Sequence, residues 1–458
     1  MPSPFQGIET ASRALRAFQR NLDTTGHNIA NVNTRGYSRQ VVGLSATTPN
    51  VEWSRGQISI GSGVTVSTIS RIRDGMLESR RQDAYSEQGR SEGSLSNLEK
   101  VQSTFLDAQG KGISSALSTF YNSWSALGSN PTSAASQLQV QSAGRDLAQK
   151  ISGTYAHLKS QDASQTDQIN QTLSDIQSIA NQIGEINDEI KKQTVEGGSP
   201  NDLFDQRDQL ISDLSKLVNV DTHIASDGTT SVFVGSFTLV DQVGATQFPT
   251  TVNSASSTIS NAIGTWSVTS GKLKGLFDNS NQVAGYKTQL DDLANTLRTQ
   301  VNSIHMAGFT STGATGIQFF NDSSPQTGAA DFALSAAVNA SATNIVIGNT
   351  TAAGDGSAAL AISGLRDIKF ASLGTRTSET FFADLASTVG RDVKVARNEV
   401  DTANALSEQL EAQVQDVAGV SLDDEMANML RFQRSYQAAA KVLNTMDSLM
   451  GDLINMLR

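Results

Sequence analysis

Three charged residues in one short stretch have the types and spacing that acid–base chemistry uses. Asp205, Arg207 and Asp208 lie within residues 199–210, which read Ser-Pro-Asn-Asp-Leu-Phe-Asp-Gln-Arg-Asp-Gln-Leu. On a helix the two aspartates are neighbours, and adjacent carboxylates can separate their pKa values. No nucleophile or metal ligand accompanies them in this stretch. We therefore expect a surface ion pair or a tether between domains rather than a catalytic pair.

The other reactive residue types do not assemble into a recognisable site either. The chain has no cysteine, and its four histidines form no HExxH or i,i+4 pair: His27, His157, His223 and His305. Gly271-Lys272 is not a P-loop, because Leu273 follows it and Trp266 occupies the position of the first glycine. We expect no metal site, no cofactor and no enzymatic activity.

Length and charge narrow the class of protein. With 458 residues the chain is too long for one ordinary core. Its net charge of −11 disfavours nucleic acid as a partner. No stretch approaches the roughly 20 apolar residues of a membrane span, and no cleavable signal peptide is visible. We expect several domains, no nucleic acid and no membrane insertion.

Both ends of the chain carry apolar residues at helical spacing. The spacing of three and four is that of a coiled-coil seam. Each terminal helix therefore needs a partner, and pairing of the N- and C-terminal helices is the simplest arrangement. We expect full burial of the two seams only when copies pack side by side. The candidate assembly residues are Leu15, Phe18, Leu22 and Ile29 in the first helix, and Met429, Phe432, Tyr436, Leu443, Met446, Met450, Leu453 and Leu457 in the last.

An asparagine-rich turn follows the first seam and adds five candidate assembly residues. Asn28, Asn31 and Asn33 either form a recognition surface between subunits or cap local backbone groups. Gly36 is suited to a tight or left-handed turn. Tyr37 can pack with its hydroxyl at the edge of a small hairpin.

Between the ends, helical periodicity alternates with β-type composition. The fold class predicted is mainly α with a β-rich insertion, in which long coiled-coil-like terminal helices pair. A small hairpin is expected from Gln57–Ile60 and Val64–Thr68, and a strand at Asn344–Ile347. The predicted domains are a discontinuous terminal helical domain (1–40 and 420–458), a helical domain with the hairpin (41–218, 283–307 and 376–419), and a β-rich outer domain (219–282 and 308–375).

Four segments resemble the axial proteins of the bacterial flagellum. Residues 28–40, NIANVNTRGYSRQ, are similar to the N-terminal signature of rod, hook and hook-associated proteins, and the ending YSRQ is most similar to the hook-associated protein 1 family. Residues 199–210 resemble a motif of hook-associated proteins 1 and 3. Residues 302–309, NSIHMAGF, and 419–457 resemble the middle and the C-terminal helix of protein 1. Together the matches span most of the chain.

The resemblance implies a structural role outside the cell. The terminal helices would line the flagellar axis, the other helices would form a second shell, and the β-rich part would face outward. Copies would form a homo-oligomeric ring at the hook–filament junction, next to hook protein and hook-associated protein 3. Export would use the flagellar type III system, and a cytoplasmic chaperone would hold the C-terminal helix beforehand.

Two alternatives remain at this stage. One is a sibling axial protein, either hook-associated protein 3 or a hook or rod component. The other, from a different class, is a coiled-coil signalling or adhesion protein, which would explain the heptads but not the Asn-rich Gly-Tyr turn.

Overall fold

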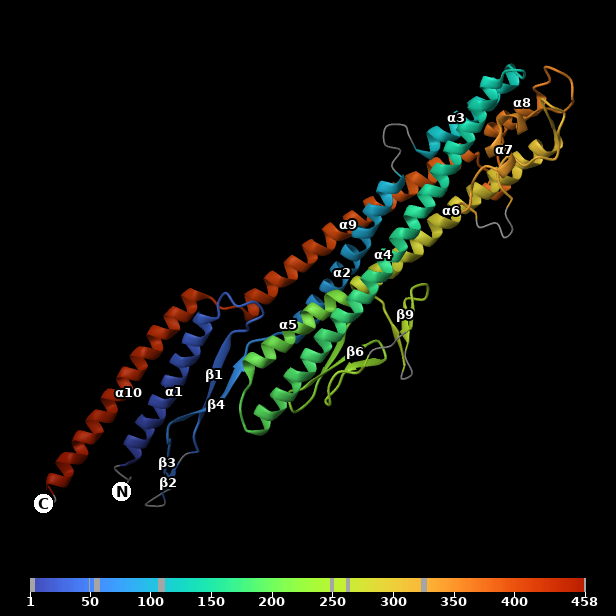
Figure 1. Ribbon diagram of the computed structural model, residues 1–458. Coiled ribbons are helices and arrows are strands. Elements are labelled where there is room, and N and C mark those ends of the chain that lie inside the picture. The colour runs from blue at the N-terminus through green and yellow to red at the C-terminus, as the bar shows by residue number, and fades with distance from the viewer. Residues whose placement is uncertain are drawn as a thin grey trace.

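The molecule is an elongated rod built mainly of long helices (Figure 1). The computed structural model describes residues 5–48, 50–52, 58–105, 112–247, 251–260, 264–322 and 328–456. Small sheets are inserted between the helices, so the prediction of a mainly α fold with a β insertion is confirmed.

The two terminal helices lie side by side at one end of the rod, as predicted. α1 (Phe5–Ala30) and α10 (Leu422–Met456) run antiparallel, with both chain ends at the tip (Figure 1). A Cβ added to Gly7 would lie 3.2 Å from Met446 Cε, and Arg39 Nε lies 2.6 Å from Glu425 Oε1. These two contacts fix the register, in which the start of α10 faces the end of α1.

The strands after α1 pair differently from the prediction. β1 (Gln40–Ala46) pairs antiparallel with β4 (Val64–Arg71), while β2 (Asn50–Glu52) pairs with β3 (Ile58–Ile60). The expected hairpin of Gln57–Ile60 with Val64–Thr68 is therefore wrong, and Gln57 lies outside the described residues. Alternation identifies a strand but not its partner. β1 and β4 also lie against α1, as Figure 1 shows.

The body of the rod is a bundle of long helices. α2 packs along α9 and α6, and α4 along α3, α5 and α6. The largest core runs through this bundle, with Leu117, Trp124 and Leu290 fully buried. The body helices are α2 (Gly75–Phe105), α3 (Ile113–Ser129), α4 (Ala134–Val195), α5 (Asn201–Leu217), α6 (Lys272–Ala307) and α9 (Ser378–Ala418).

The β-type segments have two different structures. Residues 221–267 form two three-stranded sheets, ordered β5-β6-β7 and β10-β9-β8. The described part of residues 308–375, expected to be β-rich, instead holds short helices and one two-stranded pair. The strands are β5 (Asp221–Ile224), β6 (Thr230–Val234), β7 (Phe237–Val240), β8 (Thr251–Asn253), β9 (Thr258–Ser260), β10 (Thr265–Ser267), β11 (Phe309–Thr310) and β12 (Val346–Gly348). The short helices are α7 (Ala336–Ala340), η2 (Ala342–Asn344), α8 (Ser357–Gly364), η3 (Leu365–Asp367) and η4 (Ala371–Leu373).

A buried histidine connects α6 to the pair β11–β12. His305 Nδ1 lies 2.6 Å from the carbonyl oxygen of Ile317, to which it donates, and Nε2 accepts from the amide of Val346 at 3.0 Å. Burial lowers the pKa of His305 to about 4, although the bond to Ile317 opposes this. The neutral ring can therefore keep both bonds at physiological pH. His305 has a structural role here, within an aromatic core that includes Trp124 and Phe319.

Three glycines allow α2 to approach its neighbours closely. A Cβ on Gly89 would lie 1.9 Å from the carbonyl oxygen of Lys216, and a Cβ on Gly275 would lie 2.1 Å from that of Arg90. Gly89 and Gly93 flank Ser91 in a G-x-S-x-G sequence, the pattern of hydrolase nucleophile elbows. That pattern requires a strand-to-helix turn, whereas Ser91 is buried in the middle of α2. The glycines therefore serve helix packing.

We expect Gly275→Ala to destabilise the body by about 1–3 kcal/mol, because the new methyl group forces α6 away from the α2 backbone. Thermal and urea unfolding of the purified chain measure this. The matched control is Gly285→Ala in the same helix, where a Cβ meets nothing within 4 Å. The control should be stabilising by about 0.5–1 kcal/mol. Equal effects of the two substitutions would contradict close packing at Gly275.

Candidate assembly site and its anchor

The seams of the terminal helices face each other but are only partly covered. Leu15, Phe18 and Leu22 of α1 are half-buried, as are Met429 and Leu443 of α10. Ile29, Phe432, Met446 and Met450 are also half-buried. Tyr436 is 37% exposed. The side chains of Leu453 and Leu457 lie outside the described residues. One helix pair therefore leaves part of each seam open.

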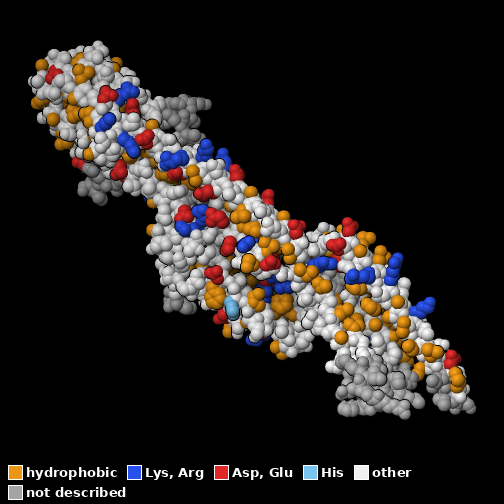
Figure 2. All heavy atoms as spheres, turned by 180° about the vertical axis from the view of Figure 1, so that it is seen from behind, with side chains coloured by type: hydrophobic (Ala, Val, Ile, Leu, Met, Phe, Trp, Pro, Cys, Tyr) orange, Lys and Arg blue, Asp and Glu red, His pale blue; other side chains and the backbone are white. Residues whose placement is uncertain are grey.

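A second set of apolar side chains on α10 points away from α1. Met426 is 58% exposed, Leu449 57% and Ile454 57%. Apolar side chains gather at this end of the rod in Figure 2. Contiguous exposed apolar surface usually marks a contact with another macromolecule. Among the side chains of α10 that the structure describes, the exposed large apolar residues are Leu422, Met426, Leu430, Tyr436, Val442, Leu449, Ile454 and Met456.

Two of the three signature asparagines are used inside the chain. The side chain of Asn28 is buried and bonds both ways with Gln40, donating to its carbonyl at 2.9 Å and accepting from its amide at 3.0 Å. Asn31 Nδ2 donates to the carbonyl of His27, and its Oδ1 accepts from Thr34. Asn33 is exposed. The geometry favours backbone capping for Asn28 and Asn31 and leaves Asn33 available to a neighbour.

Gly36 and Tyr37 complete this turn. Gly36 has φ of 79°, a left-handed conformation that suits glycine. The hydroxyl of Tyr37 donates to Asn28 Oδ1 at 2.8 Å and lies 3.0 Å from His27 Nδ1. Burial, followed by the charges of nearby carboxylates, raises the pKa of Tyr37 well above its ordinary value. The turn is thus held against β1 by side-chain bonds, with the phenol neutral.

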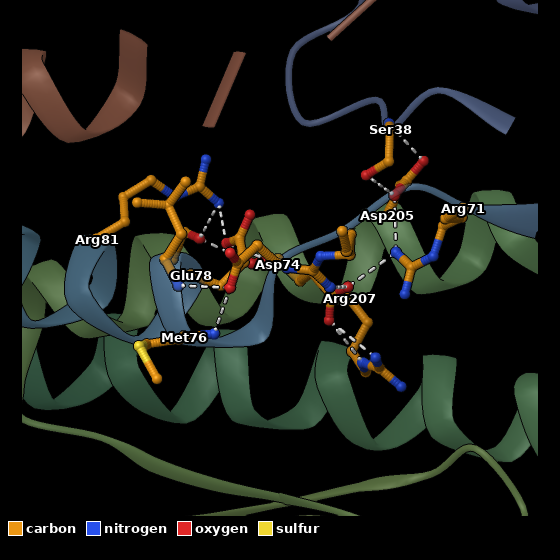
Figure 3. A network of polar contacts seen from close by, with 12 residues as sticks. Ser38, Arg71, Asp74, Met76, Glu78, Arg81, Asp205 and Arg207 are labelled. Carbon is orange, nitrogen blue, oxygen red and sulfur yellow. Dashed lines mark hydrogen bonds and ion pairs between the residues drawn. The ribbon is translucent and has the colours of Figure 1, made fainter. Parts of the chain in front are cut away.

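Asp205 of α5 connects the Asn-rich turn and strand β4 to the helical body. Ser38 donates to Asp205 twice, from its amide at 3.0 Å and its hydroxyl at 2.8 Å, and Arg71 Nη1 donates at 2.7 Å (Figure 3). Asp205 is 6% exposed. The three contributions come from the turn, from β4 and from α5, so this carboxylate joins the terminal part to the helical body.

Asp208, one turn later, holds three guanidinium groups. It accepts from Arg71 at 2.9 Å and from Arg207 at 2.8 Å, and it also bonds Arg73. Burial alone would raise the pKa of Asp208, but the three arginines keep it below its ordinary value. Arg207 is 1% exposed and also donates to the carbonyl of Gly228 at 2.7 Å. The expected surface ion pair is therefore a buried cluster, in keeping with the expected tether.

The cluster continues to the last body helix. Arg81 bonds Glu78 at 2.7 Å (Figure 3). Arg73 bonds the same carboxylate at 3.1 Å. Arg81 also reaches Glu411 of α9 at 3.0 Å, where the hydroxyl of Tyr85 donates at 2.8 Å. Burial and Glu411 raise the pKa of Tyr85 to about 12, so it stays a donor. We call the whole set the anchor: Ser38, Arg71, Arg73, Glu78, Arg81, Tyr85, Asp205, Arg207, Asp208 and Glu411.

The sequence indicates only part of the anchor. Asp205, Arg207 and Asp208 are recognisable as candidates because they share one motif. Arg71, Arg81 and Glu411 are single charged residues in unrelated stretches, and the separations of Asp205 from Ser38 and of Arg81 from Glu411 are 167 and 330 residues. Only the fold brings these residues together.

The described residues offer little for other chemistry. Among them no group of three His, Cys, Asp or Glu side chains could hold a metal ion. Within the same ranges no helix has the length and apolar character needed to cross a membrane. The arrangement is suited to positioning and packing helices.

Family profiles match three parts of the chain. A profile described as the helical domain of flagellar hook-associated protein FlgK matches residues 98–320. Profiles described as flagellar basal body rod FlgEFG protein C-terminal and as flagella basal body rod protein match residues 412–456 and 8–37. The last two coincide with the terminal helices and their seams.

Curated proteins match over the full length. Flagellar hook-associated protein 1 of Bacillus subtilis strain 168 is 28% identical over 502 residues, covering 99% of each chain. That of Salmonella typhimurium is 26% identical, covering 98% of this chain and 99% of the relative. A solved structure, the flagellar hook junction protein FlgK from Burkholderia pseudomallei, shares the fold with a TM-score of 0.64 at 16% identity, covering 74% of this chain and 100% of that one.

Proposed function

Because this chain belongs to the family of flagellar hook-associated protein 1, it is a structural component of the bacterial flagellum, and we propose that it joins hook to filament by lateral packing of its terminal helices. It is a hook–filament junction protein of the extracellular flagellum and not an enzyme. Full-length similarity to hook-associated protein 1 sets aside the sibling axial proteins and the coiled-coil signalling or adhesion protein as alternatives.

The incomplete burial of α1 and α10 is the observation that carries the packing mechanism. Each helix covers one face of the other, and exposed apolar residues such as Leu430 and Leu449 remain. Burying one such side chain contributes about 1.5–3 kcal/mol. An isolated amphipathic pair is marginal in water because helix stability comes mainly from packing. In the proposed mechanism, neighbouring copies of the chain bury the apolar residues that the pair of α1 and α10 leaves exposed.

The partners proposed for this chain are those that membership of the family implies, and the packing mechanism is compatible with them. A repeated contact between unlike surfaces of one chain closes into a ring or continues as a helix, and the homo-oligomeric ring is the form proposed here. Hook protein on one side and hook-associated protein 3 on the other are the proposed neighbours. The exposed methionines of α10 support a second, earlier partner, an export chaperone, since methionine adapts to several surfaces. Export itself is proposed through the flagellar type III system.

The proposed domain division follows the same logic. The paired helices α1 and α10 form the axial part (1–40 and 420–458), and the anchor joins it to the helical body. The two sheets of residues 219–282 lie on the flank of the rod (Figure 1) and are proposed to face outward. The proposed assembly residues are those of the two seams and of the Asn-rich turn.

Removal of residues 428–458 tests the packing mechanism. We expect the body to stay folded, because among the described residues its two main cores end at Ala396 and the other buried apolar residues of α9 end at Ala418. Incorporation at the junction should be lost, so cells that produce only this chain should secrete it and carry hooks without filaments. Circular dichroism and immunoblots of medium and of isolated hooks measure this. Motile cells with filaments would overturn the proposal.

A further inference from the structure

An open groove runs between α1 and the strands beside it. Its volume is 840 Å³, and it is lined by α1 on one side and by Thr47 and residues 64–66 on the other. Val64 and Val66, both partly exposed, give it an apolar part, whereas Ala17 at its base is only 1% exposed. The seam that faces α10 does not contribute to it, so the groove remains open although the terminal helices are paired.

Three arginines line the α1 wall of this groove. Arg13, Arg16 and Arg20 are spaced by three and four, so they form one stripe. Arg13 already bonds Glu9, and it donates to the carbonyl of Ser62 at 3.3 Å. In the part of the chain that the structure describes, neither Arg16 nor Arg20 makes an ion pair with a carboxylate. The groove thus offers two unpaired cations beside an apolar strip, with Glu9 and Asp23 as its acidic residues.

The first turns of α10 carry the complementary features. Leu422, Met426 and Leu430 recur every four residues and are 46%, 58% and 56% exposed. Asp423 and Asp424 are exposed in the same turns. Asp423 borders this stripe, and Asp424 lies further round the same turn of the helix. We call the stripe together with these two carboxylates the acidic start of α10.

Within one molecule these two surfaces do not meet. The pairs Gly7–Met446 and Arg39–Glu425 place the acidic start opposite residues near the end of α1. Arg16 lies roughly ten residues further along, about 15 Å at 1.5 Å per residue. A second copy shifted along the rod can bring its α10 to the groove.

We propose that the groove beside Arg16 and Arg20 binds the acidic start of α10 from a second copy of this chain. This rests on the proposed function and specifies one of its contacts. The surfaces are unlike, so each copy gives one and receives one, which is the arrangement that produces rings or helical stacks. Exposed ion pairs add little affinity. The apolar stripes drive binding, and the charges select the register.

Charge reversal in full-length chains tests the contact in cells that lack the native copy. R16E/R20E and D423R/D424R should each reduce the amount retained at the junction at least about tenfold, because like charges then meet across the contact. The quadruple variant restores opposite charges at every contact and should regain filaments. K191E/K192E at the exposed end of α4 is the control, with the same change in charge as R16E/R20E and no expected effect.

The outcomes separate this contact from the proposed function. Retention of R16E/R20E at the wild-type level, or a quadruple variant no better than either double variant, overturns the groove contact. If the chain lacking residues 428–458 still fails to assemble in those same cells, the packing mechanism stands without it. Secreted amounts in the medium and circular dichroism exclude failures of export and folding.

Cysteine cross-linking provides a direct measurement, since the chain has no native cysteine. Q19C/M426C should give disulfide-linked dimers and larger ladders in isolated flagella under oxidation, because Gln19 is exposed on the α1 wall of the groove. K192C/M426C should give none. A Q19C/M426C strain that carries filaments but yields only monomer contradicts the contact.

Discussion

Asp208→Ala is expected to lower the free energy of unfolding by about 3–5 kcal/mol, because removal of one partner from a buried ionic cluster leaves the other charges uncompensated. Asp208 bonds Arg71, Arg73 and Arg207, and Arg207 is 1% exposed, so water cannot replace the lost carboxylate there. Urea unfolding followed by circular dichroism measures the loss. The variant should unfold at a lower urea concentration than the wild type. Its terminal helices should also be less stably attached to the body.

The control for this substitution lies on the same helix. Asp213 is partly exposed and pairs with Arg35 at 3.5 Å, so Asp213→Ala should change stability by no more than about 1 kcal/mol. Amide exchange in residues 38–46 and 64–73 provides a second readout, because these segments contain the anchor residues Ser38, Arg71 and Arg73. An Asp208→Ala chain as stable as the Asp213→Ala chain would show that the cluster does not hold the parts together.

The same carboxylate makes stability depend on pH in a definite direction. The arginines lower the pKa of Asp208 in the folded chain below the ordinary 3.8. The folded state therefore favours the ionised form, and this contribution is present above about pH 4. It is lost as the pH falls through the lowered pKa of the folded state.

The sequence was sufficient where one segment alone carries the information. The heptads of α1 and α10 and the helical periodicity of α2, α4 and α9 are local patterns, and the structure places long helices there. The pairing of the two ends was predicted because an uncovered apolar stripe at each terminus needs a partner. The composition of residues 308–375 gives conflicting signals, because Ala favours helix, Thr favours strand, and Gly and Ser favour turns. There the packing of Ile345, Ile362 and Leu373 into the main core decided the structure.

The sequence was insufficient where contacts join distant segments. Val64–Arg71 reads as a strand whichever neighbour it has, and its pairing with Gln40–Ala46 is decided by the shared surface of α1. From the sequence, Asp205 and Asp208 have the pattern of solvent-exposed charges on a helix. No neighbouring residue indicates that Ser38 and Arg71 bury them in the fold. The assembly residues of the Asn-rich turn remain predictions, although Asn28 is already satisfied within the chain.

Leu443→Asp is expected to abolish incorporation at the junction while the body stays folded. Leu443 is half-buried on the seam of α10, one turn from Met446, which approaches Gly7 of α1. The substitution removes about 1.5–3 kcal/mol of apolar burial and adds a charge that must lose water in any packed interface. A total loss of about 3 kcal/mol at each contact lowers affinity at least about 100-fold.

A substitution at the neighbouring residue separates the effect of losing apolar burial in the seam from the effect of adding a negative charge. Asn444 is exposed, and Asn444→Asp adds the same charge one position away with almost no change in size. Cells producing Asn444→Asp should carry filaments and swim, whereas cells producing Leu443→Asp should release the chain into the medium and carry bare hooks. Both chains should unfold at the wild-type temperature in the transition of the body, since neither residue belongs to its cores. Equal assembly of the Leu443→Asp and Asn444→Asp chains would contradict this prediction. The face of α10 that holds copies together would then be its outer face, along Leu430 and Leu449. The seam would serve only to pair the two ends of a single chain.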